Sequence, residues 1–472
     1  MSTFLPELVS DILLRLPVKT LLRLRCVSKS LCYEIDSPEF IKNNLNKSMR
    51  NRLRQKLIVN NRNCSHFYAL DFDGGFKKAT TLKYPFKSSV DTPIAIGGSC
   101  NGLILFVLGK SSKLLALWNP FTRRYKKIPP CPVVTLPDYV RTSSLGLGHD
   151  PAHDDYKIVM ISAFCEHRHY WYQSWVFSLK KNSWRRSPDA PSTMERYKSS
   201  FANGALYWQS NSDDRCNMVG FDLTNEVYFK IPLFVDSGLL INTTDTRRLY
   251  FYYDNMVVFG GEVYTTKVTA ESKTLEFYLE VSDKGRIGRW KKAFEMEDEE
   301  MEKDLNDEDD EHDSRRFGLR DSRHLELPCP LAYSKDGDSI LAYKKNEVFW
   351  YNPETKSRQR VEILGIPKAK SHWYNLLDNC YEFHVCWESL VSLGNEGVFD
   401  AAPKMSSVET LREIAENLTG MSSVRLACIF FLSCFGVWYF WPTAAAFILP
   451  GINSFLLAMR VYLMQHKRWL FY

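Results

Sequence analysis

The chain has 472 residues, of which 45% are hydrophobic, 25% charged and 14% aromatic, and its formal net charge is +6. This composition excludes collagen-like, low-complexity and wholly disordered chains, and the small net charge does not by itself imply a nucleic-acid partner. Because aromatic residues favour strands and a chain of this length is typical of about three domains, we expect a large all-β body with smaller segments beside it.

The first segment, residues 1–45, is predicted to fold into short helices. Apolar side chains recur at helical spacing up to Pro17, and a second apolar pattern follows over residues 20–27. The Ser37-Pro38 pair marks the start of a further helix, since serine caps helices and proline suits their first turn. A cluster this small buries little apolar surface, so we expect it either to pack against a partner or to cap the next domain.

Residues 46–63 are predicted to be a linker, and residues 46–60 within it hold five basic residues and few acids. An RNA-contacting patch is one interpretation of this composition. We prefer a solvated helix that leads into the next domain, because no stacking aromatic residues interleave with the basic ones.

Residues 64–393 consist of short apolar and aromatic runs separated by Gly, Asn, Asp and Pro, which is typical of strands and turns. A degenerate repeat aligns residues 117–129 with 220–232, and residues 351–353 fit the same frame as strand, Asx/Pro turn, strand. Such copies predict the blades of a kelch-like β-propeller, with a β-sandwich or an irregular sheet assembly as the alternative. The residues of this blade motif are Trp118, Asn119, Pro120, Phe221, Asp222, Tyr351, Asn352 and Pro353.

Residues 295–313 interrupt the β body with thirteen acids and one lysine, so the rest of the chain carries a net charge of +18. The segment has no core-forming pattern and is predicted to be a disordered surface loop. An electrostatic tether for a basic partner is the functional alternative.

The C-terminal part is predicted to be a linker over 394–425 followed by an apolar, helical tail over 426–463. Residues 426–459 contain no charged side chain, and a membrane span needs only about 20 apolar residues. One kinked span, a re-entrant hairpin, and an extension produced by altered reading or splicing of the gene are the three interpretations. If the tail is expressed, we expect the full-length protein to fractionate with membranes.

The remaining chemistry-bearing residues do not form a convincing site. The twelve cysteines include no CxxC pair, which favours reduced, mostly buried thiols. The two histidines and three aspartates of residues 149–155 suggest a metal site, but a turn between strands is the preferred interpretation. Residues 165–169, with a cysteine, a glutamate and two histidines, are interpreted as part of a strand and loop. No metal, no cofactor and no catalytic residue are expected.

Residues 5–45 resemble the F-box motif of plant F-box proteins, with Leu31 at a position where that family usually has tryptophan. The resemblance rests on Leu5, Pro6, Ile12, Leu13, Leu16, Pro17, Leu21, Leu24, Cys26, Val27, Ser28, Lys29 and Ser30. It implies that a Skp-family adaptor is contacted by Leu5, Pro6, Ile12, Leu13, Leu16, Pro17, Leu21, Leu24, Val27 and Ser28.

The region that follows is similar to the F-box-associated interaction domain, a degenerate kelch-like propeller. The likeness is carried by GSCNGLILF (98–106), LWNPFTRRYKKIP (117–129), GLGHDPAHDDYKIV (146–159), VFWYNPETK (348–356) and ESLVSL (388–393), among others in the same order. The fold expected from both resemblances is an α + β multidomain chain: residues 1–45 form a helical F-box, and residues 64–393 form an all-β propeller.

The resemblance implies the substrate receptor of a Skp–cullin–F-box ubiquitin ligase, similar to plant F-box/kelch-repeat proteins that include some limiting immune-receptor levels. Its partners would be the Skp adaptor, through it a cullin, and a protein substrate, with no nucleic acid. The compartment would be cytoplasm or nucleus, with membrane association only through residues 426–463. Two rivals remain: a kelch-like oxidase or binding protein, and a membrane-tethered adaptor outside ubiquitination. Candidate substrate loops are 131–144, 165–174, 209–217 and 236–247.

Overall fold

The computed structural model divides the chain into two compact units, one that contains the N-terminal helices up to Lys47 and one that runs from Ser48 to Phe399. The structure describes residues 6–50, 52, 54–61, 66–72, 79–86, 94–108, 114–132, 140–166, 169–191, 199–212, 215–232, 256–269, 274–283, 286–297, 328–344, 347–366, 381–394 and 397–398. The expected apolar tail over 426–463 and most of the acidic insertion lie outside these residues, although residues 295–297 end a strand.

The predicted helical cluster is present as four short helices. They are α1 (Pro6–Leu13), α2 (Val18–Leu24), α3 (Lys29–Ile35) and α4 (Pro38–Arg50). Two serines cap these helices: the Ser28 hydroxyl accepts the Leu31 amide at 3.1 Å, and the Ser37 hydroxyl accepts the Phe40 amide at 3.1 Å. The core of this unit is formed by Leu13, Leu16, Val18, Leu21, Leu24, Ile35, Phe40 and Leu45, all at most 7% exposed.

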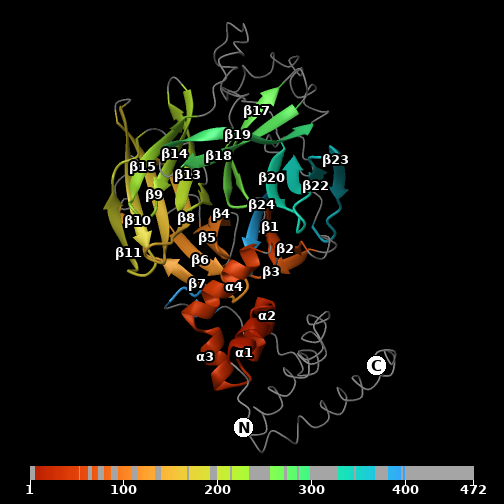
Figure 1. The fold of residues 1–472 in the computed structure, drawn as a ribbon. Coiled ribbons are helices and arrows are strands. Elements are labelled where there is room, and N and C mark those ends of the chain that lie inside the picture. The colour runs from red at the N-terminus through yellow and green to blue at the C-terminus, as the bar shows by residue number, and fades with distance from the viewer. Residues whose placement is uncertain are drawn as a thin grey trace, which may run out of the picture. The chain divides into compact units, whose positions relative to one another are not determined.

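The second unit is a β-propeller of six described sheets, each a twisted antiparallel blade (Figure 1). Blade one contains β24 (Tyr381–Trp387), β1 (Gln55–Asn61), β2 (His66–Asp71) and β3 (Thr80–Leu82). Blade two contains β4 (Ile94–Cys100), β5 (Leu103–Leu108), β6 (Leu114–Asn119), β7 (Arg124–Ile128) and β25 (Gly397–Val398). Blade three contains β8 (Val140–Asp150), β9 (Asp155–Glu166), β10 (His169–Ser178) and β11 (Ser183–Ser187).

The other three blades repeat this arrangement. Blade four contains β12 (Ser200–Ala202), β13 (Ala205–Ser212), β14 (Arg215–Asp222) and β15 (Val227–Pro232). Blade five contains β16 (Met256–Phe259), β17 (Glu262–Thr269), β18 (Thr274–Asp283) and β19 (Arg286–Glu297). Blade six contains β20 (Cys329–Tyr333), β21 (Ile340–Lys344), β22 (Glu347–Asn352) and β23 (Ser357–Val361). The expected β-propeller is therefore confirmed, with six blades, and the β-sandwich alternative is excluded.

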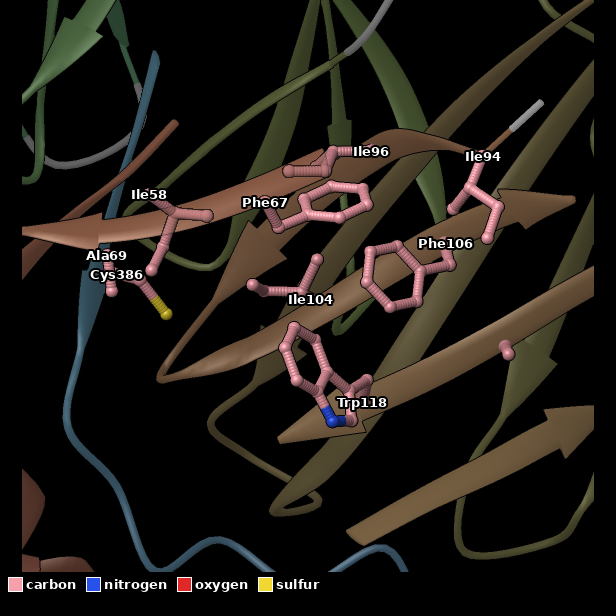
Figure 2. Close-up of a cluster of buried hydrophobic side chains, with 10 residues drawn as sticks. Ile58, Phe67, Ala69, Ile94, Ile96, Ile104, Phe106, Trp118 and Cys386 are labelled. Atoms are coloured by element: carbon pink, nitrogen blue, oxygen red, sulfur yellow. The ribbon is translucent and has the colours of Figure 1, made fainter. Parts of the chain in front are cut away.

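Apolar side chains lie between neighbouring blades, which explains why the strands read as short apolar runs. Between blades one and two, Phe67 packs against Phe106 with ring centroids 5.1 Å apart, and Phe106 stacks on Trp118 at 5.2 Å (Figure 2). Similar clusters join the other neighbours, for example Phe277 with Tyr351 between blades five and six. Burying both faces of each blade gives the propeller its core without a separate layer of helices.

The ring is closed by pairing the end of the propeller with its beginning. Strand β24 pairs antiparallel with β1, from Gln55 opposite Trp387 to Asn61 opposite Tyr381. The Glu388 amide then donates to the Arg54 carbonyl at 3.1 Å. Gly102 approaches this seam so closely that a Cβ there would meet the Trp387 carbonyl at 2.5 Å. A side chain at position 102 would therefore push against the closing strand.

Three expected boundaries differ from the structure. Residues 46–63, expected as a linker, contain the end of α4 and strand β1. The strand was not expected because the apolar run within Gln55–Asn61 is short and follows basic residues. The candidate loops 165–174 and 209–217 are mostly strand, since each is the end of a long hairpin. Among the described residues, no helix is both long enough and apolar enough to cross a membrane.

Candidate functional site

The ten predicted adaptor-binding residues divide by their place in the helical unit. Leu13, Leu16, Leu21 and Leu24 form the interior of this unit. Ile12 and Pro17 are half-buried, and Ser28 caps α3. Val27 is 37% exposed, while Leu5 and the side chain of Pro6 lie outside the described residues. Four of the ten therefore hold the unit together, and contact of any of them with an adaptor stays a prediction.

Large apolar side chains on the surface of the helical unit were only partly foreseen. Tyr33 is 83% exposed, Leu8 is 51% exposed and Val27 is 37% exposed. Leu8 is one of the apolar residues at helical spacing before Pro17, but among these residues Leu13 and Leu16 are buried and Leu8 is exposed. A small unit that leaves such side chains in solvent has surface that a protein partner can cover.

The blade motif marks the same turn in three blades. The side-chain oxygen of Asn119 accepts the amides of Phe121 and Thr122 at 3.0 and 3.2 Å. Asp222 accepts the amides of Thr224 and Asn225 in the same way, and Asn352 those of Glu354 and Thr355. Pro120 and Pro353 are the first turn residues, and the aromatic residues preceding the turns, Trp118, Phe221 and Tyr351, are buried. The motif is thus a folding element of the blade.

Asn119 has a second role that sequence reasoning missed. Its side-chain amide donates to the carbonyls of Ser389 and Val391 at 3.0 and 3.1 Å, and the residue is fully buried. The ESLVSL segment that follows β24 is therefore held against blade two. No sequence pattern could indicate this contact, because about 270 residues separate the partners.

A buried charge network joins blades three and four. The Lys157 ammonium on β9 lies 2.8 Å from carboxylate oxygens of Asp150 and of Glu226, and it donates to the Leu223 carbonyl at 2.5 Å. The Thr224 hydroxyl adds a bond to Asp150 at 2.8 Å. Burial alone would raise the pKa of the Asp150 carboxyl, but these donors outweigh it and hold that pKa well below its ordinary value.

This network predicts a specific pH dependence of stability. A carboxyl whose pKa is lowered by folding stabilises the protein fully above its unfolded pKa of about 3.9, and the contribution is lost as the pH falls. We expect Asp150→Asn to be less stable than the wild type at pH 7, and the difference to shrink as the pH falls below about 4. Urea unfolding of both proteins across that range measures it, and a pH-independent difference would contradict the assignment.

The residues considered as a metal site form a turn, as preferred from the sequence. Residues 151–154 connect β8 and β9, with His153 Nδ1 2.7 Å from Asp150 and His149 Nε2 3.1 Å from Asp154. Within the described part of the chain, no cluster of three or more His, Cys, Asp or Glu side chains is arranged to hold a metal ion.

The innermost strands surround a cavity of about 490 Å³ near the centre of the propeller. Its lining includes the turn Asn101–Gly102, the turn Gly260–Gly261, Phe201, Tyr343 and Trp387, and no Asp, Glu, Lys or Arg. The lining also includes His384 and the cysteines Cys100, Cys329 and Cys386, and burial raises the pKa of each of these thiols.

The connections between strands differ at the two ends of the propeller. At one end, short turns such as 101–102, 120–123 and 223–226 join the strands. Because the strands of each blade alternate in direction, the strand ends that flank the four candidate loops lie at the opposite end, which we call the loop face. They belong to the connections β7–β8, β9–β10, β13–β14 and β15–β16. Connectivity therefore groups the strand ends beside the candidate loops at one end of the propeller, while residues 133–139, 167–168, 213–214 and the whole of 236–247 lie outside the described residues.

Comparison with known proteins accounts for both units. The F-box domain model matches residues 4–43, and the F-box associated beta propeller domain model matches residues 60–312. The F-box protein CPR1 of Arabidopsis thaliana is 35% identical over 207 residues, which is 41% of this chain and 48% of that protein. An F-box/LRR-repeat protein of the same plant is 23% identical over 415 residues, covering 79% of this chain and 83% of that protein.

Two further comparisons mark the limits of these similarities. Another Arabidopsis thaliana F-box protein is 31% identical over 49% of this chain and 61% of its own length, so the chain spans about half to three fifths of these more similar relatives. Among solved structures, TolB from Acinetobacter baumannii aligns with a TM-score of 0.38 at 11% identity, over 65% of this chain and 63% of TolB.

Proposed function

We propose, from the premise that the chain belongs to the F-box proteins with an F-box associated beta propeller domain, that it is the substrate-recognition subunit of a Skp–cullin–F-box ubiquitin ligase. The observation that carries the proposal is the presence of two different binding elements on one chain. One is a small helical unit with exposed apolar side chains, and the other is a six-blade propeller with a loop face.

In this proposal the helical unit binds a Skp-family adaptor through the F-box residues, and the loop face of the propeller binds the target protein. The chain contributes no catalytic residue. It raises the effective concentration of a substrate lysine near the charged ubiquitin-conjugating enzyme, which converts a rare encounter into an intramolecular one. Ubiquitination then directs the target to the proteasome, in cytoplasm or nucleus.

The resemblance to plant proteins that limit immune-receptor levels makes an immune receptor the first substrate class to test. The test is affinity capture of the full chain from plant cells in which the proteasome is inhibited, compared with a Leu8→Asp/Val27→Asp variant. We expect Skp adaptor and cullin to be lost from the variant, while substrate proteins remain bound through the propeller. A wild-type capture that contains neither adaptor nor cullin would refute the ligase proposal.

A further inference from the structure

Two outer strands of blades two and three carry many basic side chains, which we call the basic rim. Its members lie on β7, on β11 and in the turns before them: Arg123, Arg124, Lys126, Lys127, Lys180, Lys181, Arg185 and Arg186. The Trp184 indole donates to the Pro129 carbonyl at 2.7 Å, which joins the two outer strands.

Among the described residues, part of the basic rim has no balancing charge. In the portion of the chain that the structure describes, Arg123, Lys126, Lys127 and Lys181 have no acidic partner within ion-pair distance, and three of these four lie within five residues of one another. Like charges at such spacing repel each other. A surface that keeps them is electrostatically complementary to an acidic partner.

Blade six gives the contrast, because its outer strand is equally basic but balanced. Lys356 lies 3.1 and 2.7 Å from carboxylate oxygens of Glu295 and Glu297. Arg358 and Arg360 lie 3.6 and 3.0 Å from those of Glu347. Basic residues on an outer strand therefore do not by themselves leave free charge, and the unpaired basic residues of blade two distinguish it from blade six.

The surroundings of the basic rim favour a protein over a nucleic acid. The Tyr125 ring packs edge-on against Phe86 at 5.3 Å, and the Trp184 ring packs against Phe177 at 5.4 Å. These aromatic rings are engaged within the propeller, whereas recognition of single-stranded nucleic acid depends on rings that are free to stack on bases.

The edge of β7 is also partly occupied, because β25 pairs with it through Gly397 opposite Tyr125 and Val398 opposite Arg124. The basic rim consequently offers charged side chains rather than an open strand edge. We propose that it binds an Asp/Glu-rich segment of a partner protein. This inference does not depend on the ligase activity proposed above.

The test compares two triple variants of the full chain that lose the same charge. Arg123→Gln/Lys126→Gln/Lys127→Gln removes three positive charges from blade two, and Lys356→Gln/Arg358→Gln/Arg360→Gln removes three from blade six. The probe is a fluorescein-labelled oligoglutamate peptide, followed by fluorescence anisotropy at low and physiological salt. We expect the blade-two variant to bind about tenfold more weakly than the wild type, and the blade-six variant within about twofold of it. Wild-type binding should weaken at the higher salt.

Three results would overturn the proposal. Equal losses in the two variants would show that binding follows net charge, and absence of binding to the wild type would show that the surface has no such affinity. Tighter binding of an oligouridylate of equal length would assign the surface to nucleic acid. The charge-conserving variant Arg123→Lys/Lys126→Arg/Lys127→Arg keeps the test decisive if the neutral variant misfolds. We expect this variant to bind the peptide with the wild-type affinity. Loss of its binding would also count against the proposal.

Discussion

Leu8→Asp combined with Val27→Asp is expected to abolish binding of the full chain to a Skp-family adaptor, with a loss of about a hundredfold in affinity or more. Both side chains are exposed, at 51% and 37%, so neither substitution removes packing from the interior. Leu8 lies in the first turns of α1, where a carboxylate is compatible with the helix dipole. An adaptor that covers these apolar groups would instead have to bury two unpaired charges, an effect of about 3 kcal/mol.

Two further variants separate binding from folding in this experiment. Asn46→Asp adds a charge at an exposed position of α4 and should leave adaptor affinity unchanged, whereas Leu16→Ala opens a cavity in the fully buried core and should reduce helical content and stability by about 2–5 kcal/mol. Isothermal titration with purified adaptor and circular dichroism measure both effects. Unchanged affinity in the double variant would assign adaptor binding to another surface.

The helical unit shows what one sequence can and cannot specify about a binding surface. The spacing of apolar residues and the Ser37-Pro38 pair predict the helices, because capping and periodicity are local properties. The same pattern contains both Leu16, which is buried, and Leu8, which is exposed. Which apolar residue of an amphipathic stripe is covered depends on how the helices cross, and helix crossing is set by packing rather than by spacing along one helix.

The propeller shows the same division between local and distant information. Its blade repeat is predictable because each copy needs the same Asx turn and the same buried aromatic residue, which leave a pattern in the sequence. Strand β1 was missed although it forms a hairpin with β2, because its apolar run is short and follows basic residues; its other partner, β24, is more than 300 residues away, so their pairing left no local pattern. The charge network of Lys157 was missed because its partners belong to two blades, and contacts between blades leave no pattern along the sequence.

Asn119 and Asn352 allow the local turn contacts to be separated from the distant contact with the closing segment. The two residues occupy equivalent positions of the blade motif but have different surroundings. We expect Asn119→Asp to destabilise the propeller by about 3 kcal/mol or more. Aspartate keeps the oxygen that accepts the turn amides, but it replaces the donor to the Ser389 and Val391 carbonyls with a buried carboxylate that faces them. The closing segment after β24 would then lose its anchor on blade two.

Asn352→Asp is the matched control, because Asn352 is half-buried and its oxygen accepts the amides of Glu354 and Thr355. Asp222 already performs this role in blade four, which shows that a carboxylate satisfies the turn. The control should therefore unfold within about 0.5 kcal/mol of the wild type in urea. If both variants lost stability equally, the turn alone would account for the effect. A loss confined to Asn119→Asp would instead identify its side-chain amide as the group that holds the closing segment to blade two.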